Sequence, residues 1–167
     1  METPTDQDHS HDDKRPVIRF RRANEKYGAF SNFAPYPIEL HGETWPTVEH
    51  YFQAQKFAGT PSEEEIRRAT SPSQARRVGR QRWRGLRKDW HSVKESLMCE
   101  AVKAKFTQHN DLRDLLLSTG NAELVEHAPW DAYWGDGRDG SGLNRLGETL
   151  MRVRDELACD PGRAGTP

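Results

Sequence analysis

The chain has 167 residues, a formal net charge of −1 and two cysteines. Its length predicts one domain, and its near-neutral charge gives no whole-chain reason to expect binding to nucleic acid or to an anionic membrane. No apolar run is long enough to span a bilayer, and the acidic N-terminus lacks the apolar segment of a secretory signal. The cysteines have neither metal-ligand nor redox spacing, so we expect reduced thiols in a cytoplasmic protein with no membrane partner.

The two ends of the chain differ from the middle in composition. Residues 1–16 are polar and charged, and residues 159–167 are rich in Gly and Pro. Such segments bury too little apolar surface to fold, so we expect two disordered tails. The domain is therefore predicted at residues 17–158.

Short strands are predicted at four places. Val17 to Arg21 alternates between apolar and charged residues, which indicates a strand. Tyr36 to Leu40 and Glu43 to Trp45 flank a two-residue turn that contains glycine, and this pattern predicts a hairpin. A further strand is expected within Ala122 to Ala128.

Helices are expected from their start signals and from apolar residues at helical spacing. In chain order, their N-caps are predicted at Thr47, Ser62, Ser71, Asp89, Asn110 and Asn144. Glu65 and Gln74 complete possible capping boxes with Ser62 and Ser71. Because helices dominate and no β-α-β units alternate, the predicted fold class is mainly α, an α+β fold with a few short strands in one compact domain.

The helix after Thr47 carries the first candidate for chemistry. Glu49, Gln53 and Lys56 lie at i, i+4 and i+7, within one narrow arc bordered by Phe52 and Phe57. A Glu–Lys face is commonly a solvated stripe. The same arc could form one wall of a pocket, and spacing alone does not separate the two interpretations.

The loop from Pro129 to Asn144 is the second candidate, because it is long for a connection inside a compact domain. It holds four glycines, the aspartates Asp131, Asp136 and Asp139, and the aromatics Trp130, Tyr133 and Trp134. Aspartates can act as acid or base, and aromatic rings can stack on a flat base. The alternatives are a calcium loop, whose EF-hand spacing is not met, and a capped turn with its aromatics in the core.

Basic residues form the third candidate. Nine of them, Arg67, Arg68, Arg76, Arg77, Arg80, Arg82, Arg84, Arg87 and Lys88, occur between residues 66 and 88 with no acidic residue among them. One or two could grip a phosphate, or the stretch could be a solvated surface or a weak nucleic-acid patch. Trp90 and Lys94 follow one turn apart, where Trp90 could be a stacking surface or a core residue.

Sequence signals for bound cofactors are absent. The chain has no Walker-type phosphate loop, no GxGxxG, no GxSxG and no His-x-x-x-His pair. We therefore expect neither a metal nor a nicotinamide or flavin cofactor.

Five segments of the chain resemble the NADAR family, and most of all its YbiA-like N-glycosidases. These segments are YGAFSNF (27–33), WPTVEHYFQAQKF (45–57), SPSQARRVGR (71–80), RKDWHSVKESLM (87–98) and DAYWGDGRDGSGLNRLG (131–147). The resemblance extends from about Val17 to Leu157 and implies a compact, mainly helical domain.

The resemblance also implies an activity. YbiA-like proteins hydrolyse N-glycosidic bonds in phosphoribosylated aminopyrimidine intermediates of riboflavin biosynthesis, and other NADAR proteins remove ADP-ribose from guanine bases. The expected partner is thus a small phosphoribosylated or ADP-ribosylated base, with contact to modified nucleic acid in the second case. A non-catalytic module that binds ADP-ribose or a nucleotide is a further alternative.

Site residues follow from the resemblance together with the residue types. The resemblance implies a functional glutamate at Glu49, a tryptophan at Trp90 and an acidic loop from Asp131 to Asp136. A Schiff-base lysine, proposed for the guanine-acting branch, could be Lys26 or Lys56. The expected catalytic residues are Glu49, Asp131, Asp136 and Lys56. The expected substrate-binding residues are Lys26, Tyr27, Asn32, Phe33, Trp45, Gln53, Arg80, Trp90, Lys94, Trp134 and Asn144.

Overall fold

The computed structural model describes residues 15–159. The tails expected at 1–16 and 159–167 therefore lie outside the described residues, apart from residues 15, 16 and 159. The elements are β1 (Val17–Phe20), η1 (Gly28–Phe30), β2 (Ile38–Leu40), β3 (Glu43–Trp45), α1 (Val48–Ala54), η2 (Gln55–Phe57), α2 (Pro61–Arg67), α3 (Pro72–Gly79), η3 (Arg82–Arg84), α4 (Trp90–Gln108), α5 (Asn110–Leu117), β4 (Glu123–Glu126) and α6 (Arg145–Cys159).

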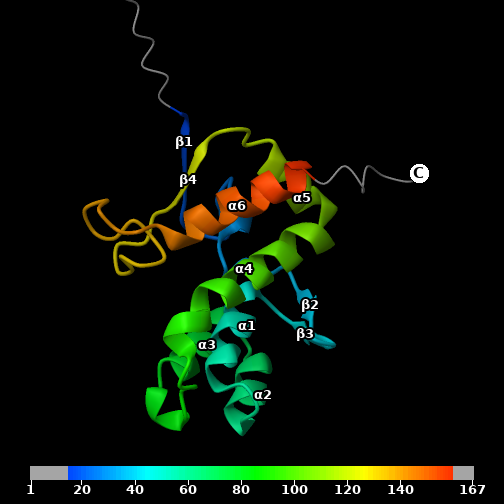
Figure 1. Ribbon diagram of the computed structural model, residues 1–167, viewed down its shortest axis with the longest axis vertical. Coiled ribbons are helices and arrows are strands. Elements are labelled where there is room, and N and C mark those ends of the chain that lie inside the picture. The colour runs from blue at the N-terminus through cyan, green and yellow to red at the C-terminus, as the bar shows by residue number, and fades with distance from the viewer. Residues whose placement is uncertain (1–14, 160–167) are drawn as a thin grey trace, which may run out of the picture.

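Helix α4 is the axis on which the domain is assembled. It packs against α1, α5 and α6 (Figure 1), and its apolar side chains Met98, Val102 and Phe106 are fully buried. Helix α1 lies between α4 and the pair α2 and α3, and every one of its residues is buried. The predicted mainly helical, single-domain fold with short strands is confirmed. None of the helices within residues 15–159 is long and apolar enough to cross a membrane.

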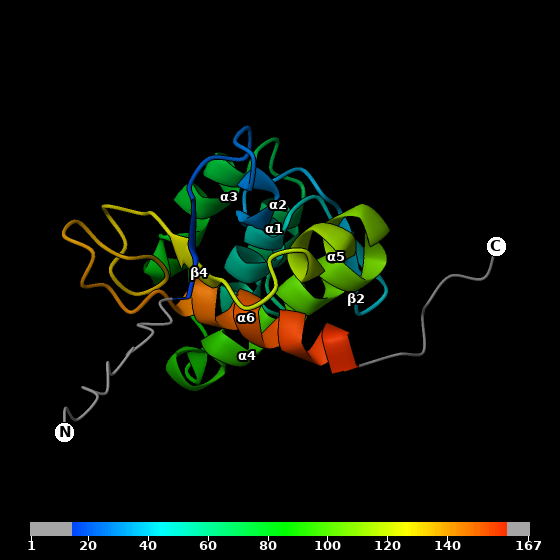
Figure 2. The ribbon, with the colours of Figure 1, turned by 90° about the horizontal axis from the view of Figure 1, so that it is seen from above.

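The parallel pair β1–β4 joins the N-terminal strand to the segment between α5 and α6. Val17 pairs with Glu123, and Phe20 pairs with Glu126, so the N-terminal strand lies beside the start of the 127–144 loop. This loop projects from one side of the molecule (Figure 2). The antiparallel hairpin β2–β3 is as predicted, and both residues of its turn have positive φ, His41 at 56° and Gly42 at 79°.

Two of the predicted N-caps are confirmed. The Thr47 Oγ1 accepts a hydrogen bond from the His50 N–H at 3.2 Å, and the Ser71 Oγ accepts one from the Gln74 N–H at 3.2 Å. The Gln74 side chain does not complete a capping box, because its Oε1 accepts from Thr70 instead.

Two N-cap predictions are wrong in position, and at Asp89 and Asn144 the residue precedes its helix as predicted but its side chain does not cap it. Helix α2 begins earlier than Ser62, at Pro61, and Asn110 is the first residue of α5 rather than its cap. The Asp89 carboxylate makes no cap because Arg87 donates to both of its oxygens, at 2.6 and 2.9 Å. The Asn144 side chain instead holds strand β4: it donates to the Leu124 carbonyl and accepts from the backbone N–H of Glu126. The amide thereby ties the end of the long loop to the strand that precedes it.

Candidate active site

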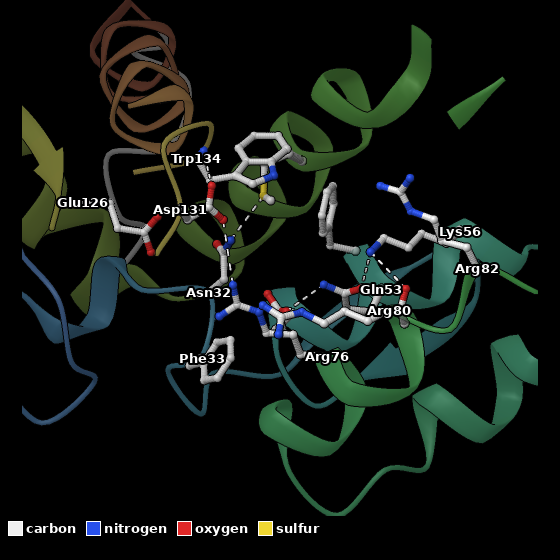
Figure 3. Close-up of a pocket in the computed structure, with 14 residues that line it drawn as sticks. Asn32, Phe33, Gln53, Lys56, Arg76, Arg80, Arg82, Glu126, Asp131 and Trp134 are labelled. Carbon is white, nitrogen blue, oxygen red and sulfur yellow. Dashed lines mark hydrogen bonds and ion pairs between the residues drawn. The ribbon is translucent and has the colours of Figure 1, made fainter. Parts of the chain in front are cut away.

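A cavity of about 280 Å³ opens where α1, α3, the 30–33 segment and the 127–144 loop meet. Figure 3 shows lining side chains on two sides of the cavity. Glu126, Asp131 and Trp134 lie on one side, and Lys56, Arg80 and Arg82 lie on the other. Arg76 and Asn32 lie between them. The cavity thus has an acidic end and a basic end.

Three side chains on α1 and η2 form one wall of the cavity, and a relay of hydrogen bonds links them. The Lys56 Nζ donates to the Gln53 Oε1 at 2.6 Å, and the Gln53 Nε2 donates to the Glu49 Oε1 at 2.8 Å. Glu49 and Gln53 are only 5% and 6% exposed, so the interpretation of this arc as a solvated stripe is wrong. The helical spacing correctly predicted that the three residues lie together, and all three line the cavity.

Close approach of α3 to this wall depends on Gly79. A Cβ at this position would lie 2.1 Å from the Gln53 Oε1, and the Gly79 carbonyl accepts a hydrogen bond from the Lys56 Nζ at 3.1 Å. Since real Cβ contacts are never this short, any larger residue would displace the Gln53 amide. The glycine therefore lets α3 close one side of the cavity.

Burial shifts the protonation of both ends of this relay. It raises the pKa of Glu49 above its ordinary value, although the hydrogen bond from Gln53 and the charges of Arg76 and Lys56 oppose the shift. Burial lowers the pKa of Lys56 to about 8, against the attraction of Glu49. Burial thus disfavours the charged form of both groups.

Asp131 and Trp134 enter the cavity from the long loop. The Asp131 Oδ1 accepts hydrogen bonds from the backbone N–H groups of Tyr133 and Trp134 at 3.0 and 2.9 Å. Its other oxygen lies 3.8 Å from the Arg76 Nη2. The loop backbone therefore fixes the carboxylate and leaves one oxygen toward the cavity.

Glu126 is a cavity carboxylate that sequence reasoning missed. It is the last residue of β4, and it lines the cavity beside Asp131. Its pKa is raised to about 7, chiefly by burial and further by the charges of Asp131 and Glu49. A possible sequence signal was its position: an acidic residue at the end of a predicted strand, just before the loop that holds the other candidates.

The structure separates the cavity-lining arginines from the rest of the basic stretch. Arg76, Arg80 and Arg82 line the cavity. Others are held in ion pairs away from it, such as Arg84 with Glu65. The prediction that a few of these residues could bind a phosphate remains a prediction, and Arg80, named from the sequence, is one of the three that face the cavity.

Asp136 and Asn144 are placed outside the cavity lining. The buried Asp136 carboxylate lies 3.0 Å from the His127 Nδ1 and accepts a hydrogen bond from the Ala128 N–H at 3.1 Å. Asn144 holds β4, as described above. Both side chains organise the loop, and neither one borders the space in which a substrate could lie.

Trp90 and Trp45 lie in the core rather than in the cavity lining. Trp90 is 6% exposed, and its ring packs against Phe52 with the ring centres 5.0 Å apart. The Lys56 Nζ is 5.5 Å from the centre of the Trp90 ring. Trp90 therefore supports the cavity wall from behind, while Trp45 donates its indole N–H to the Leu40 carbonyl.

The remaining candidates are also divided between the cavity lining and positions outside it. Asn32 and Phe33 line the cavity, and the Asn32 carbonyl accepts the N–H of Glu49. Lys26 and Tyr27 are outside the lining, with the Lys26 Nζ 5.1 Å from the centre of the Tyr27 ring. Lys94 is also outside it, with its Nζ over the ring of Tyr133. Among residues 15–159, Lys56 is the only lysine that lines this cavity.

Nothing in the described part of the chain is arranged as a metal centre. Within residues 15–159, no group of three or more His, Cys, Asp or Glu side chains is placed to hold an ion. The lining offers carboxylates, amides and cations, which suit acid–base chemistry and the binding of an anionic, hydroxylated ligand.

Sequence relatives match the chain over most of its length. It is 56% identical over 144 residues to the N-glycosidase YbiA of Escherichia coli (strain K12), a match that covers 86% of this chain and 90% of that protein. It is 47% identical over 144 residues to an N-glycosidase of Nostoc punctiforme, covering 84% and 92%. The chloroplastic riboflavin biosynthesis protein PYRR of Zea mays is 44% identical over 156 residues, covering 84% of this chain and 25% of that protein.

Structural comparison agrees with the sequence matches. The NMR structure of the E. coli protein YbiA is similar with a TM-score of 0.81 and 56% sequence identity, covering 87% of this chain and 86% of that one. The NADAR domain matches residues 19–158. The resemblance inferred from five sequence segments is therefore confirmed, and the chain belongs to the NADAR family.

Proposed function

We propose that this protein is an N-glycosidase that hydrolyses the bond between base and ribose in phosphoribosylated aminopyrimidine intermediates of riboflavin biosynthesis. The broader class, a hydrolase acting on N-glycosyl compounds, rests on the N-glycosidases of E. coli and Nostoc punctiforme. The pathway is supported by the riboflavin biosynthesis protein of Zea mays. We place the reaction in the cytoplasm.

The observation that carries this proposal is the division of the cavity into two ends. Glu126 and Asp131 lie toward one end, while Lys56, Arg80 and Arg82 lie toward the other. Glu49 belongs to the wall between these ends, where Gln53 links it to Lys56. A sugar phosphate fits this arrangement because its phosphate needs cationic donors and its anomeric carbon needs carboxylates.

Cleavage of the glycosidic bond passes through an oxocarbenium-like state that a nearby carboxylate stabilises. The Glu49 Oε1 is held by Gln53, which leaves its second oxygen for the anomeric carbon and for the attacking water. Glu126, with a pKa of about 7, is protonated in about half of the molecules at neutral pH and supplies a proton to the departing nitrogen. Water gives its oxygen to the anomeric carbon and its proton to Glu49.

The decisive experiment follows free base from two substrates, a phosphoribosylated aminopyrimidine and an ADP-ribosylated guanine nucleoside. We expect release from the pyrimidine substrate alone. Release from the guanine substrate alone would favour the ADP-ribosyl-guanine hydrolase, and binding of both without release would favour a non-catalytic module. Either of these two results would overturn the proposal.

A further inference from the structure

A second cavity, of about 470 Å³, adjoins the first. Four residues, Phe33, Arg76, Glu126 and Asp131, line both cavities. The Arg76 guanidinium lies 5.8 Å from the centre of the Phe33 ring and 3.8 Å from the Asp131 carboxylate, so these side chains form a shared boundary. The carboxylates at this boundary face the two spaces at once.

The far side of the second cavity has a different chemistry from the first. It is lined by Arg21, Arg22 and Trp130, together with Ala128 and Pro129. Trp130 is 87% exposed, an unusual position for a large aromatic side chain. Within residues 15–159, neither arginine side chain has an ion-pair partner. The parallel pairing of β1 with β4 brings the arginines and the tryptophan to the same cavity.

The direction of the proposed reaction connects the two cavities. If the sugar phosphate lies in the first cavity with its phosphate toward Arg80 and Arg82, its anomeric carbon lies farther along the cavity, toward Glu126, with Glu49 on the wall beside it. The base is attached on the far side of that carbon. It then points across the boundary, away from the basic end.

The aromatic residues support this placement. Trp90 cannot stack on a ligand, because Phe52 covers its ring and only 6% of the residue is exposed. Trp134 contributes to the first cavity, where its ring already packs edge-on against Phe52 at 5.2 Å. Trp130 is the aromatic of the loop whose ring remains free, and it lies at the second cavity.

We propose that the second cavity is the site of the departing base, a flat pyrimidinone that stacks on Trp130 and accepts hydrogen bonds from Arg21 or Arg22, with Glu126 at the boundary as its proton donor. This assignment rests on the proposed function. As the bond from the anomeric carbon to the nitrogen breaks, the Glu126 carboxylic acid gives its proton to that nitrogen, and the neutral base leaves through the second cavity.

The test measures binding of the two products separately, without turnover. The probes are free triaminopyrimidinone and ribose 5-phosphate, each titrated calorimetrically into wild type, Trp130→Ala, Arg80→Ala and Trp83→Ala. The last variant is the matched control, because Trp83 is 80% exposed and lines neither cavity. Removal of an exposed tryptophan should leave the fold intact.

We expect Trp130→Ala to weaken binding of the pyrimidinone about tenfold, since stacking on an aromatic ring contributes about 1–3 kcal/mol per base. Binding of ribose 5-phosphate should be unaffected in this variant and weakened in Arg80→Ala. Trp83→Ala should change the affinity for neither probe. Unchanged pyrimidinone affinity in Trp130→Ala would overturn the assignment, as would loss of both probes in Arg80→Ala.

Turnover by the wild type, measured in parallel, separates this inference from the proposed function. Suppose that the wild type releases no base from the phosphoribosylated pyrimidine, while Trp130→Ala, alone among the variants, weakens binding of the pyrimidinone. The second cavity is then a base site and the proposed reaction is wrong. If base is released but Trp130→Ala binds the pyrimidinone as the wild type does, the reaction stands and the assignment of the cavity fails.

Discussion

A half-buried lysine, Lys56, and a fully buried one, Lys105, show how differently one residue type can serve this fold. Lys56 lies in the cavity wall, where its Nζ donates to the Gln53 Oε1 and the Gly79 carbonyl. Lys105 lies in the last turn of α4 and is 1% exposed. Its Nζ donates to the backbone carbonyls of Ala29 and Ser31, the latter at 2.9 Å.

The surroundings of the two amines explain their different roles. Burial alone lowers the pKa of Lys105 to about 7. The pKa of Lys56 is lowered to about 8 by burial, and charged cavity residues act on it in both directions, Glu49 raising it and Arg82 lowering it. The more strongly shifted lysine is therefore the one without a cavity. A perturbed pKa indicates a functional site only when the group also faces a space that a substrate can enter.

Lys105 contributes to the site indirectly. The carbonyls that it holds belong to the segment from η1 to Asn32, and the Asn32 carbonyl in turn accepts the N–H of Glu49. The same segment supplies Asn32 and Phe33 to the cavity. Lys105 thus fixes a loop, whereas Lys56 and Glu49 present their functional groups to the cavity.

The contrast between groups that face the cavity and a lysine that fixes a loop can be tested by substitution. The largest effect is expected for Glu49→Gln. The amide is nearly isosteric and can keep the contact with Gln53, but it can neither take a proton from water nor stabilise positive charge. Turnover should fall at least ~10²-fold, the scale of lost acid–base help. The melting temperature should not fall, because burial disfavours the charge that the substitution removes.

Base release and thermal unfolding are measured together for this variant. Glu123→Gln is the control, since Glu123 is an exposed residue of β4 that lines neither cavity. Turnover near the wild-type rate in Glu49→Gln would remove Glu49 from the mechanism.

An intermediate effect is expected in the pH dependence of stability. The pKa of Lys105 is about 7 in the folded protein, against 10.5 for an ordinary lysine. Between these values the unfolded chain binds more protons, so the free energy of unfolding rises with pH. Lys105→Met should remove this contribution and flatten the rise by about 1 kcal/mol per pH unit between about pH 7.5 and pH 9.5.

Lys56→Met is the matched comparison, because the folded pKa of Lys56 is about 8 and its contribution begins at higher pH. Urea unfolding of the wild type and both variants across this pH range gives the slopes. A Lys105→Met profile parallel to that of the wild type would show that the buried amine is charged in the folded state, and the contrast with Lys56 would fail.

Local patterns in the sequence predicted the features that depend on local geometry. The arc of Glu49, Gln53 and Lys56 follows from helical spacing alone, and Thr47 caps the helix that carries it. The helical fold class follows in the same way from periodicity. What spacing could not decide was whether the arc faces solvent, because this depends on the approach of α3 at Gly79.

Features that depend on long-range pairing were not predictable from the sequence. Glu126 reaches the cavity because β4 pairs with the distant strand β1. Asp136 and Asn144 carry residue types that suit catalysis or capping, but the fold of their loop engages both side chains. Trp90 is adjacent to the basic stretch in sequence, yet its ring packs behind Phe52.

The smallest effect concerns covalent chemistry at a lysine, where we expect no covalent adduct to form. A Schiff base needs a neutral amine and the aldehyde of an opened sugar. Lys56 has a pKa of about 8, so it is mainly protonated at neutral pH, and Gln53 and Gly79 hold its Nζ. Lys26, the other candidate, lies outside the cavity lining. Direct attack by water, assisted by Glu49, needs neither amine.

Borohydride added during turnover reduces any Schiff base to a stable adduct that mass spectrometry locates after digestion. We expect no lysine peptide to carry the mass of the sugar phosphate, with base release confirmed in the same tube. An adduct on the peptide of Lys56 would place its amine at the anomeric carbon and make the α1–η2 wall a covalent site. An adduct at Lys26 would require the 27–33 loop to move into the cavity. Either adduct would show that the sugar ring opens before hydrolysis and would contradict direct attack by water.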